Sequence, residues 1–258
     1  MSANSARVAV VTGVSRRKGI GFAIARRLLA DGLTVCIHSW AAHDAEQPWA
    51  PGSNEQASVI EELGGVGPRL AHVEADFADP DAPGAIIERA RAKFGAVDVL
   101  IVNHARSAPG RLGELSSNEL DLAWAVNARA TVLLVQAFAQ YHDDARSDGR
   151  VVLFTSGQHL SPMPDELPYA ISKGAVHQMT ASLADALGDR RITLNTINPG
   201  PVDTGWPSAE HLKQLMPAFP AGRWGQPEDI ARIVSWIVSP DCAWITGQVI
   251  NAEGGFRR

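Results

Sequence analysis

Short apolar runs alternate with helical patterns along this 258-residue chain. The first run, Arg7–Thr12, is rich in valine and ends at Gly13. Apolar residues then recur at helical spacing over Ile20–Ala30, and a second apolar run follows at Leu33–His38. A strand, a glycine-rich turn, a helix and a second strand form the unit from which parallel sheets are built. This alternation restricts the possible folds more than any other feature of the chain.

The alternation continues to the end of the sequence and predicts one domain over residues 1–258. We expect an α/β fold, a doubly wound parallel sheet of about seven strands with about six helices on both faces, Rossmann-like. The expected strands are Arg7–Thr12, Leu33–His38, Leu70–Ala75, Val97–Val102, Arg150–Thr155, Ile192–Ile197 and Gln248–Asn251. The expected helices are Ile20–Ala30, Asn54–Leu63, Asp79–Phe94, Ser117–Tyr141, Pro168–Leu187 and Pro227–Val238.

Two segments lack this regularity. Residues Ser39–Ser53 carry prolines and glycine without periodicity and predict a loop. Residues 204–221 predict an insertion that carries the substrate, with a short helix within Pro207–Pro220.

Composition excludes several classes of protein. The net charge is −5 and no long basic block is present, so we expect no nucleic-acid partner and no membrane surface. Cys36 and Cys242 are the only cysteines, and their spacing suggests no metal site. The N-terminal residues form no apolar targeting segment, and no apolar run approaches the ~20 residues of a membrane helix. We therefore expect a cytoplasmic protein.

Polar residues follow the predicted strands. In an open α/β sheet, ligands bind outside the carboxyl ends of the strands. After the first strand, Gly13, Gly19 and Gly21 would let the backbone approach a pyrophosphate at a helix N-terminus, although such a turn also occurs without a ligand. Thr155–Ser156 and Asn198–Gly200 follow later strands. This pattern predicts a nucleotide site at that edge.

Tyr169 and Lys173 are four residues apart on a predicted helix, so their side chains leave the same face. A nearby cation favours the phenolate and lowers the pKa of the phenol, as a tyrosine needs in order to exchange protons. Taken alone, the pair is also compatible with a partly buried aromatic residue beside a lysine that reaches solvent.

Together these residues resemble the short-chain dehydrogenase/reductase family over nearly the whole chain. Ser156 precedes Tyr169 by 13 residues, the separation that the family commonly shows. The segments Gly222–Asp229 and Ile245–Gln248 look like the branch of 3-oxoacyl-carrier-protein-reductase-like members. The remaining resemblance rests on the turn ending at Gly21 and on Asp76, Asn103, Ala105, Asn127, Lys173, Asn198–Gly200 and Thr204.

The resemblance implies roles for four catalytic residues. Tyr169 would exchange a proton with the substrate oxygen while the nicotinamide carries a hydride. Lys173 would lower the pKa of the tyrosine and bind the nicotinamide ribose. Ser156 would donate a hydrogen bond to the substrate oxygen, and Asn127 would hold a water that links Lys173 to solvent.

The resemblance also implies the binding residues. The cofactor would contact Tyr169, Lys173 and Gly13, Ser15, Arg16, Arg17, Lys18, Gly19, Ile20, Gly21, Ser39, Trp40, Asp76, Phe77, Asn103, Ala105, Pro199, Gly200, Val202 and Thr204. The substrate would contact Ser156, Gln158, His159, Met163, Tyr169 and Trp206. These walls are largely apolar and suit a medium-sized or cyclic ketone, with an acyl chain on a carrier as the other possibility.

Two departures from the family pattern affect the site. Five residues separate Gly13 from Gly19 where the family commonly has three, so we expect this loop to bulge. Arg106 stands where the family often has glycine, and it either binds an anionic substrate group or is a solvated loop residue. We expect His104 to be packed rather than catalytic.

A third departure concerns the cofactor. Family members that prefer NAD usually end the second strand with an aspartate that binds the ribose hydroxyls. Here Ser39 stands at that place, followed by Trp40, and the basic Arg16–Lys18 cluster lies one loop away. A 2′-phosphate would meet a hydroxyl and positive charge, so we predict NADP(H), with NAD(H) as the alternative.

The sequence therefore predicts an NADP(H)-dependent oxidoreductase that interconverts a ketone and a secondary alcohol. The alternative is a catalytically silent NADP(H)-binding sensor or regulatory protein on the same fold. Helices 117–141 and 168–187 carry many small and apolar residues, and the family is commonly tetrameric through them. We expect a homo-oligomer, a tetramer by this resemblance.

Overall fold

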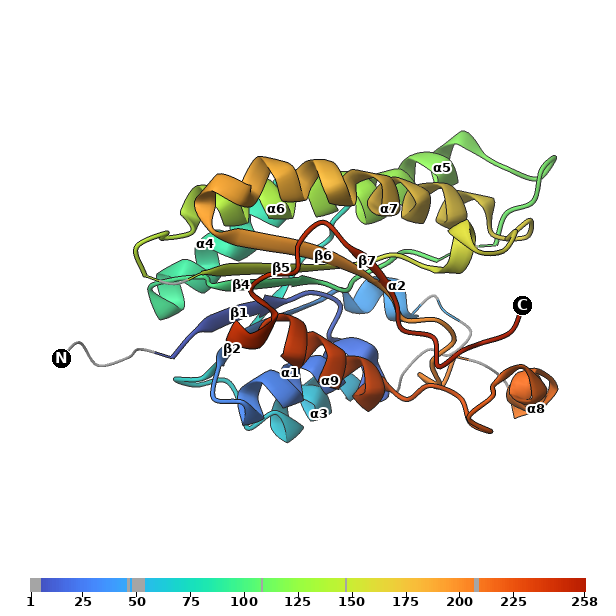
Figure 1. Cartoon of the computed structure of the whole chain (residues 1–258), viewed down its shortest axis with the longest axis horizontal. Coiled ribbons are helices and arrows are strands. Elements are labelled where there is room, and N and C mark those ends of the chain that lie inside the picture. The colour runs from blue at the N-terminus through green and yellow to red at the C-terminus, as the bar shows by residue number, and fades with distance from the viewer. Residues whose placement is uncertain (1–5, 46, 48–53, 108, 147, 207–208) are drawn as a thin grey trace.

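The fold is built on one sheet of seven strands that all run parallel, in the order β3-β2-β1-β4-β5-β6-β7. The computed structural model describes residues 6–45, 47, 54–107, 109–146, 148–206 and 209–258. Figure 1 shows the strands between two layers of helices. The strands are β1 (Val8–Val11), β2 (Thr34–Ser39), β3 (Leu70–Glu74), β4 (Val99–Val102), β5 (Gly149–Phe154), β6 (Ile192–Asn198) and β7 (Val249–Asn251).

The helices divide between the two faces of the sheet (Figure 1). Helices α1, α3 and α9 lie on one face, and α4, α6 and α7 lie on the other. The helices of the described residues are α1 (Ile20–Ala30), α2 (Ala41–Ala45), α3 (Glu55–Glu62), α4 (Ala82–Phe94), α5 (Ser117–Ala123), α6 (Ala130–Tyr141), α7 (Leu167–Leu187), α8 (Ala209–Leu215) and α9 (Pro227–Ile237). A π-helical turn, Trp124–Arg129, joins α5 to α6.

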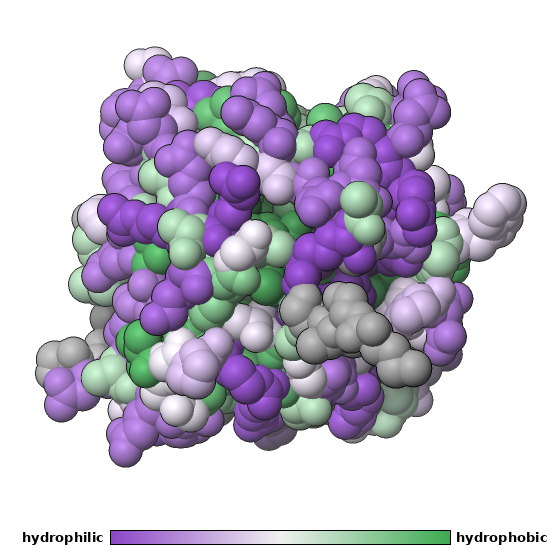
Figure 2. Space-filling model, turned by 90° about the vertical axis from the view of Figure 1, so that its left-hand side faces the viewer, coloured by the Kyte–Doolittle hydropathy of each residue, from purple (hydrophilic) through white to green (hydrophobic). Residues whose placement is uncertain are grey.

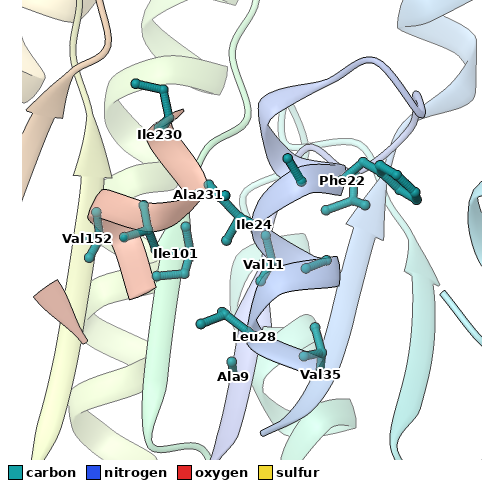
Figure 3. Packing of buried hydrophobic residues seen from close by; sticks show 14 of the residues in the cluster. Ala9, Val11, Phe22, Ile24, Leu28, Val35, Ile101, Val152, Ile230 and Ala231 are labelled. Carbon is teal, nitrogen blue, oxygen red and sulfur yellow. The ribbon is translucent and has the colours of Figure 1, made fainter. Parts of the chain in front are cut away.

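One core lies between the sheet and the pair α1–α9. Ile24 and Leu28 of α1 face Val11 of β1, and Ala231 of α9 packs beside them (Figure 3). These side chains are at most 4% exposed. Apolar residues that recur every three or four positions give each helix a single buried face, which is why the helical spacing in the sequence was informative.

A second core lies under α4, α6 and α7. Leu134 and Phe138 of α6 are fully buried there against Ile87 of α4 and Leu153 of β5. The continuous helical run Ser117–Tyr141 is long and apolar enough to cross a membrane by length and composition. More than half of its most apolar window is buried inside the protein, as in a core helix.

The predicted fold class is confirmed, and most strand ends agree within a residue or two. The predicted loop Ser39–Ser53 is wrong in part, because Ala41–Ala45 forms the short helix α2. Residues 46 and 48–53 of that segment lie outside the described residues. In Pro207–Pro220 the structure has α8 followed by a 3₁₀ turn, Met216–Ala218, and residues 207–208 lie outside the described part.

The two ends of the sheet differ in character. The loops that follow the strands gather with α2 and α8 at the right of Figure 1. At the opposite end, where the strands begin, Figure 2 shows mostly hydrophilic side chains between smaller apolar areas. The polar side chains predicted for the site lie at the carboxyl ends.

Candidate active site

The turn between β1 and α1 is held in a form that only glycine permits at two places. Gly13 has φ +71°, in the left-handed region. A Cβ at Gly21 would lie 2.3 Å from the Gly13 carbonyl oxygen. Asn103 Nδ2 donates to the carbonyl oxygens of Thr12 and Gly13, at 3.2 and 3.0 Å. The turn therefore packs closely against Asn103 and His104, and Gly13 and Gly19 line the cavity without side chains, as a phosphate-binding turn requires.

Two buried histidines support this turn as neutral groups. The Gly13 amide donates to His38 Nδ1, and His38 Nε2 donates to the Ala75 carbonyl. His104 Nε2 donates to the Val126 carbonyl, while the Thr12 hydroxyl donates to His104 Nδ1. Burial lowers the pKa of His38 to about 4 and that of His104 well below its ordinary value. His104 is packed, as the sequence predicts.

A cavity of about 730 Å³ opens along the carboxyl ends of the strands. It runs from the glycine-rich turn past β2 to the segments that flank Tyr169. Of the predicted binding residues, those that line it are Gly13, Ser15, Arg16, Gly19, Ile20, Trp40, Asp76, Phe77, Asn103, Ala105, Thr204 and Trp206.

The basic cluster divides between the cavity and the surface. Arg16 lines the cavity, and its Nη1 donates to the Thr204 carbonyl at 3.1 Å. Arg17 turns outward and pairs with Glu55 and Glu62, at 2.9 and 3.0 Å. Arg17 and Lys18 form the exposed tip of a turn closed by the Gly19 amide on the Arg16 carbonyl. The expected bulge is present, and it leaves Arg16 as the cation of this cluster that lines the cavity.

Ser39 does not line the cavity. It is fully buried, and its hydroxyl lies 2.8 Å from His72 Nε2 on β3. The flanking residues His38 and Trp40 line the cavity in its place, because alternate residues of a strand point to opposite faces.

Sequence analysis missed His43, Asp44 and Gln47, which also line this end of the cavity. They belong to, or directly follow, helix α2, which the proline-rich composition concealed. Asp44 is buried, and within the described residues its Oδ2 has no hydrogen-bond partner. Attraction to Asp44 opposes the effect of burial, which lowers the pKa of Arg16.

The structure brings three of the four predicted catalytic residues to the end of β5 and the start of α7. The Ser156 hydroxyl forms a hydrogen bond with the Tyr169 phenol. Lys173 is buried, and its Nζ donates to the Phe154 carbonyl at 2.8 Å and lies 5.9 Å from the centre of the Tyr169 ring. None of these side chains is among the residues that line the cavity, whereas Glu166, three residues before Tyr169, does line it.

Burial has the largest effect on the pKa of Tyr169 in this structure, and the predicted lowering of this pKa by Lys173 stays a prediction. Burial raises the pKa of Tyr169 to about 12, against an opposing effect of its hydrogen bond to Ser156, and the charge of Glu166 raises it further. Burial also lowers the pKa of Lys173 from 10.5 to about 8. Desolvation penalises the charged form of each group, and the ammonium is turned to the Phe154 carbonyl.

Asn127 sits in the π-helical turn between α5 and α6. Its Nδ2 donates to the Arg106 carbonyl and the Ser172 hydroxyl, and its Oδ1 accepts from the Arg106 amide. Asn127 therefore fixes the loop after β4 to α7. Its predicted role in holding a water stays a prediction.

Other predicted residues lie outside the cavity lining. His159 stacks with His177 and contacts the Ser156 carbonyl, and the Met163 carbonyl accepts from the Glu166 amide. Arg106, by contrast, lines the cavity and forms two hydrogen bonds with Glu119, so an anionic substrate group would compete with that carboxylate. The predicted residues outside the lining are Arg17, Lys18, Gly21, Ser39, Asn127, Ser156, Gln158, His159, Met163, Tyr169, Lys173, Pro199, Gly200 and Val202.

Known proteins match this chain over its full length. A family model described as enoyl-(acyl carrier protein) reductase matches residues 13–257. The uncharacterised oxidoreductase YjdA of Bacillus subtilis (strain 168) is 37% identical over 259 residues, which cover 100% of both chains. The chain belongs to the short-chain dehydrogenase/reductase family.

Solved structures agree with this membership. A blue fluorescent protein from a metagenomic library, in complex with NADPH, has a TM-score of 0.85 at 33% identity, covering 99% of this chain and 100% of its own. The angucycline C-6 ketoreductase LanV with bound NADP has a TM-score of 0.83 at 32% identity, covering 98% of this chain and 96% of its own. The predicted short-chain dehydrogenase/reductase resemblance is confirmed.

The buried ammonium of Lys173 should cost this family member stability. The difference between its pKa values of 10.5 and about 8 corresponds to about 3 kcal/mol. The Phe154 carbonyl would lose a hydrogen bond worth about 1 kcal/mol. We therefore expect Lys173→Met to raise the free energy of unfolding by about 2 kcal/mol near pH 7, measured by urea denaturation.

The effect should depend on pH with a definite sign. Below pH 8 both folded and unfolded chains hold the proton, so the cost is full. From pH 8 to 10.5 only the unfolded chain holds it, so wild-type stability rises and its difference from Lys173→Met narrows. Lys93→Met, at an exposed position, is the control and should not stabilise. A Lys173→Met protein less stable than wild type would contradict this account.

Proposed function

We propose that this protein is an NADP(H)-dependent oxidoreductase that interconverts a ketone and a secondary alcohol. The observation that carries the proposal is the group Ser156, Tyr169 and Lys173, placed beside a dinucleotide-sized cavity at the carboxyl ends of parallel strands. A carbonyl reductase or a 3-oxoacyl-reductase-like activity both fit this group. LanV is named as a ketoreductase, which favours a cyclic ketone.

Each residue has a distinct task in reduction. A pKa of about 12 keeps Tyr169 protonated at neutral pH, so its Oη holds the proton that the carbonyl oxygen receives. The Ser156 hydroxyl donates a hydrogen bond to the same oxygen as negative charge develops there. The buried Lys173 ammonium stabilises the tyrosinate that is left. When bound, NADPH supplies the hydride to the carbonyl carbon.

The residues of the cavity fit a dinucleotide cofactor. Gly13 and Gly19 line the cavity without side chains, and the following helix α1 offers its N-terminal amides. Arg16 supplies positive charge on the side of Trp40, where no carboxylate ends β2. This arrangement supports NADP(H), and Asp44 beside Arg16 keeps NAD(H) as the alternative.

We also propose a cytoplasmic homotetramer. Trp124 and Ile171, next to or on the long helices of the upper layer in Figure 1, are at least half exposed. Large apolar side chains at such positions support burial by a second copy of the chain.

A catalytically silent sensor is the competing function, and Tyr169→Phe separates the two. The substitution removes the proton donor and leaves the ring. We expect NADPH-dependent reduction of ketones to fall by at least about a hundredfold, while NADPH binding, followed by fluorescence titration, changes little. Wild-type protein that binds NADPH and reduces no ketone in a broad panel would favour the sensor.

Arg16→Ala should change the choice of cofactor. Loss of a guanidinium–phosphate contact should lower kcat/KM for NADPH at least about tenfold and leave that for NADH nearly unchanged. Arg17→Ala, which removes an exposed arginine paired with Glu55 and Glu62, is the matched control and should preserve the preference. Wild-type turnover with NADH at least as efficient as with NADPH would contradict the assignment.

A further inference from the structure

Glu166 has a fixed place next to the proton donor. It directly precedes α7, at the N-cap position three residues before Tyr169, and its charge raises the pKa of that tyrosine. The Leu167 amide donates to the Gly110 carbonyl, and the Gly110 amide donates to the Asp165 carbonyl. These bonds join the segment before α7 to the loop after β4, at the right of Figure 1.

The fold gives the Glu166 carboxylate no structural task. It does not cap the helix, although it stands at the N-cap position. Among the described residues it has no hydrogen bond and no ion pair, and yet it is half-buried and lines the cavity. Burial and the neighbouring Asp165 raise its pKa, so holding this carboxylate here costs stability.

Two arginines near Glu166 are neutralised in pairs. Arg106 is held by Glu119, with Nη2–Oε2 at 2.7 Å, and Arg111 is held by Asp165 at 2.8 Å. The Lys173 ammonium is buried and donates to the Phe154 carbonyl, so Glu166 is the charged side chain without an ion pair among the described residues that line this end of the cavity. The partial positive charge at the start of α7 favours the ionised carboxylate.

The surfaces beside Glu166 are apolar or aromatic. Leu122 and Val126 line the cavity from the α5 side, and Trp206 lines it from the substrate loop. A carboxylate beside such groups suits a ligand that is a cation with an apolar body. Glu166 would pair with the positive charge, and the apolar and indole side chains would contact the rest of the ligand.

We propose that Glu166 selects ketones that carry a protonated amine about one ring's width from the carbonyl. The carbonyl oxygen then lies at Tyr169 and Ser156 while the ammonium lies at Glu166, which directly precedes the helix of Tyr169. This inference rests on the proposed ketone reduction and names its substrate class. Glu166 acts on specificity and takes no part in the proton or hydride transfer.

Three ketones of similar shape test the inference with NADPH. N-methylpiperidone, with nitrogen opposite the carbonyl, is a cation when protonated, methylcyclohexanone is neutral, and oxocyclohexane carboxylate is an anion. For the wild-type protein, we expect kcat/KM for the cationic ketone to exceed kcat/KM for the neutral ketone about tenfold or more. We expect kcat/KM for the anionic ketone to fall below that for the neutral ketone. Glu166→Gln should remove most of this ratio.

Glu114→Gln is the matched control, since it removes the same charge from an exposed residue of the loop after β4 and should keep the wild-type ratio. The inference would be overturned by a cation-to-neutral ratio of kcat/KM that is unchanged in Glu166→Gln, or by a wild-type ratio of one or less. Reduction of the neutral ketone would still uphold the proposed function in either case. A further comparison uses hydroxycyclohexanone, which is polar but neutral. If Glu166→Gln lowered kcat/KM for this ketone as much as for the cationic ketone, the inference would also be overturned, since the charge of the substrate would then be irrelevant. If none of the ketones is reduced, both proposals fail.

Discussion

Burial of both faces of a parallel sheet decides where this protein can place polar chemistry. Helices α1 and α9 cover one face and α4, α6 and α7 cover the other, so β1, β4 and β5 are buried along their whole length. Polar groups within such strands would be desolvated without partners. The strand ends are where backbone and side chains meet water, and all seven strands end at the same edge. The glycine turn, the neutral histidines and the Ser156–Tyr169 pair follow from that constraint.

Desolvation also sets the charges of the site. Lys173 is buried and Tyr169 is partly buried. Burial raises the pKa of Tyr169 to about 12 and lowers that of Lys173 to about 8, so it favours the neutral form of each group. A tyrosine in this state is suited to giving a proton to a carbonyl oxygen, and a lysine with a lowered pKa is costly to keep charged. Burial of this pair therefore lowers the stability of the folded protein, as is common at active sites. Two hydrogen bonds fix the backbone around the pair: Asn127 donates to the Ser172 hydroxyl, and the Thr155 hydroxyl donates to the Lys173 carbonyl.

Local patterns in the sequence predicted the sheet, most element bounds and the group at β5 and α7, because these depend on periodicity and short spacings. The features that were missed depend on neighbours distant in the chain. Arg17 pairs with Glu55 and Glu62 at the surface, and Arg16 lines the cavity. Ser39 is turned to His72 of the neighbouring strand. The pKa of Tyr169 rises because of burial, which the spacing of Tyr169 and Lys173 does not reveal. Helix α2 lies within a segment whose prolines predicted a loop.

The central claim is that the protein moves a hydride from a nicotinamide to a carbonyl carbon at the Tyr169 site. The most direct measurement uses NADPH that carries deuterium at the transferable position of the nicotinamide, with a cyclic ketone as acceptor. Mass spectrometry of the alcohol should show one deuterium, on the carbon that bears the new hydroxyl. Alcohol that forms without deuterium, or bound NADPH that is never oxidised by any ketone, would contradict the account.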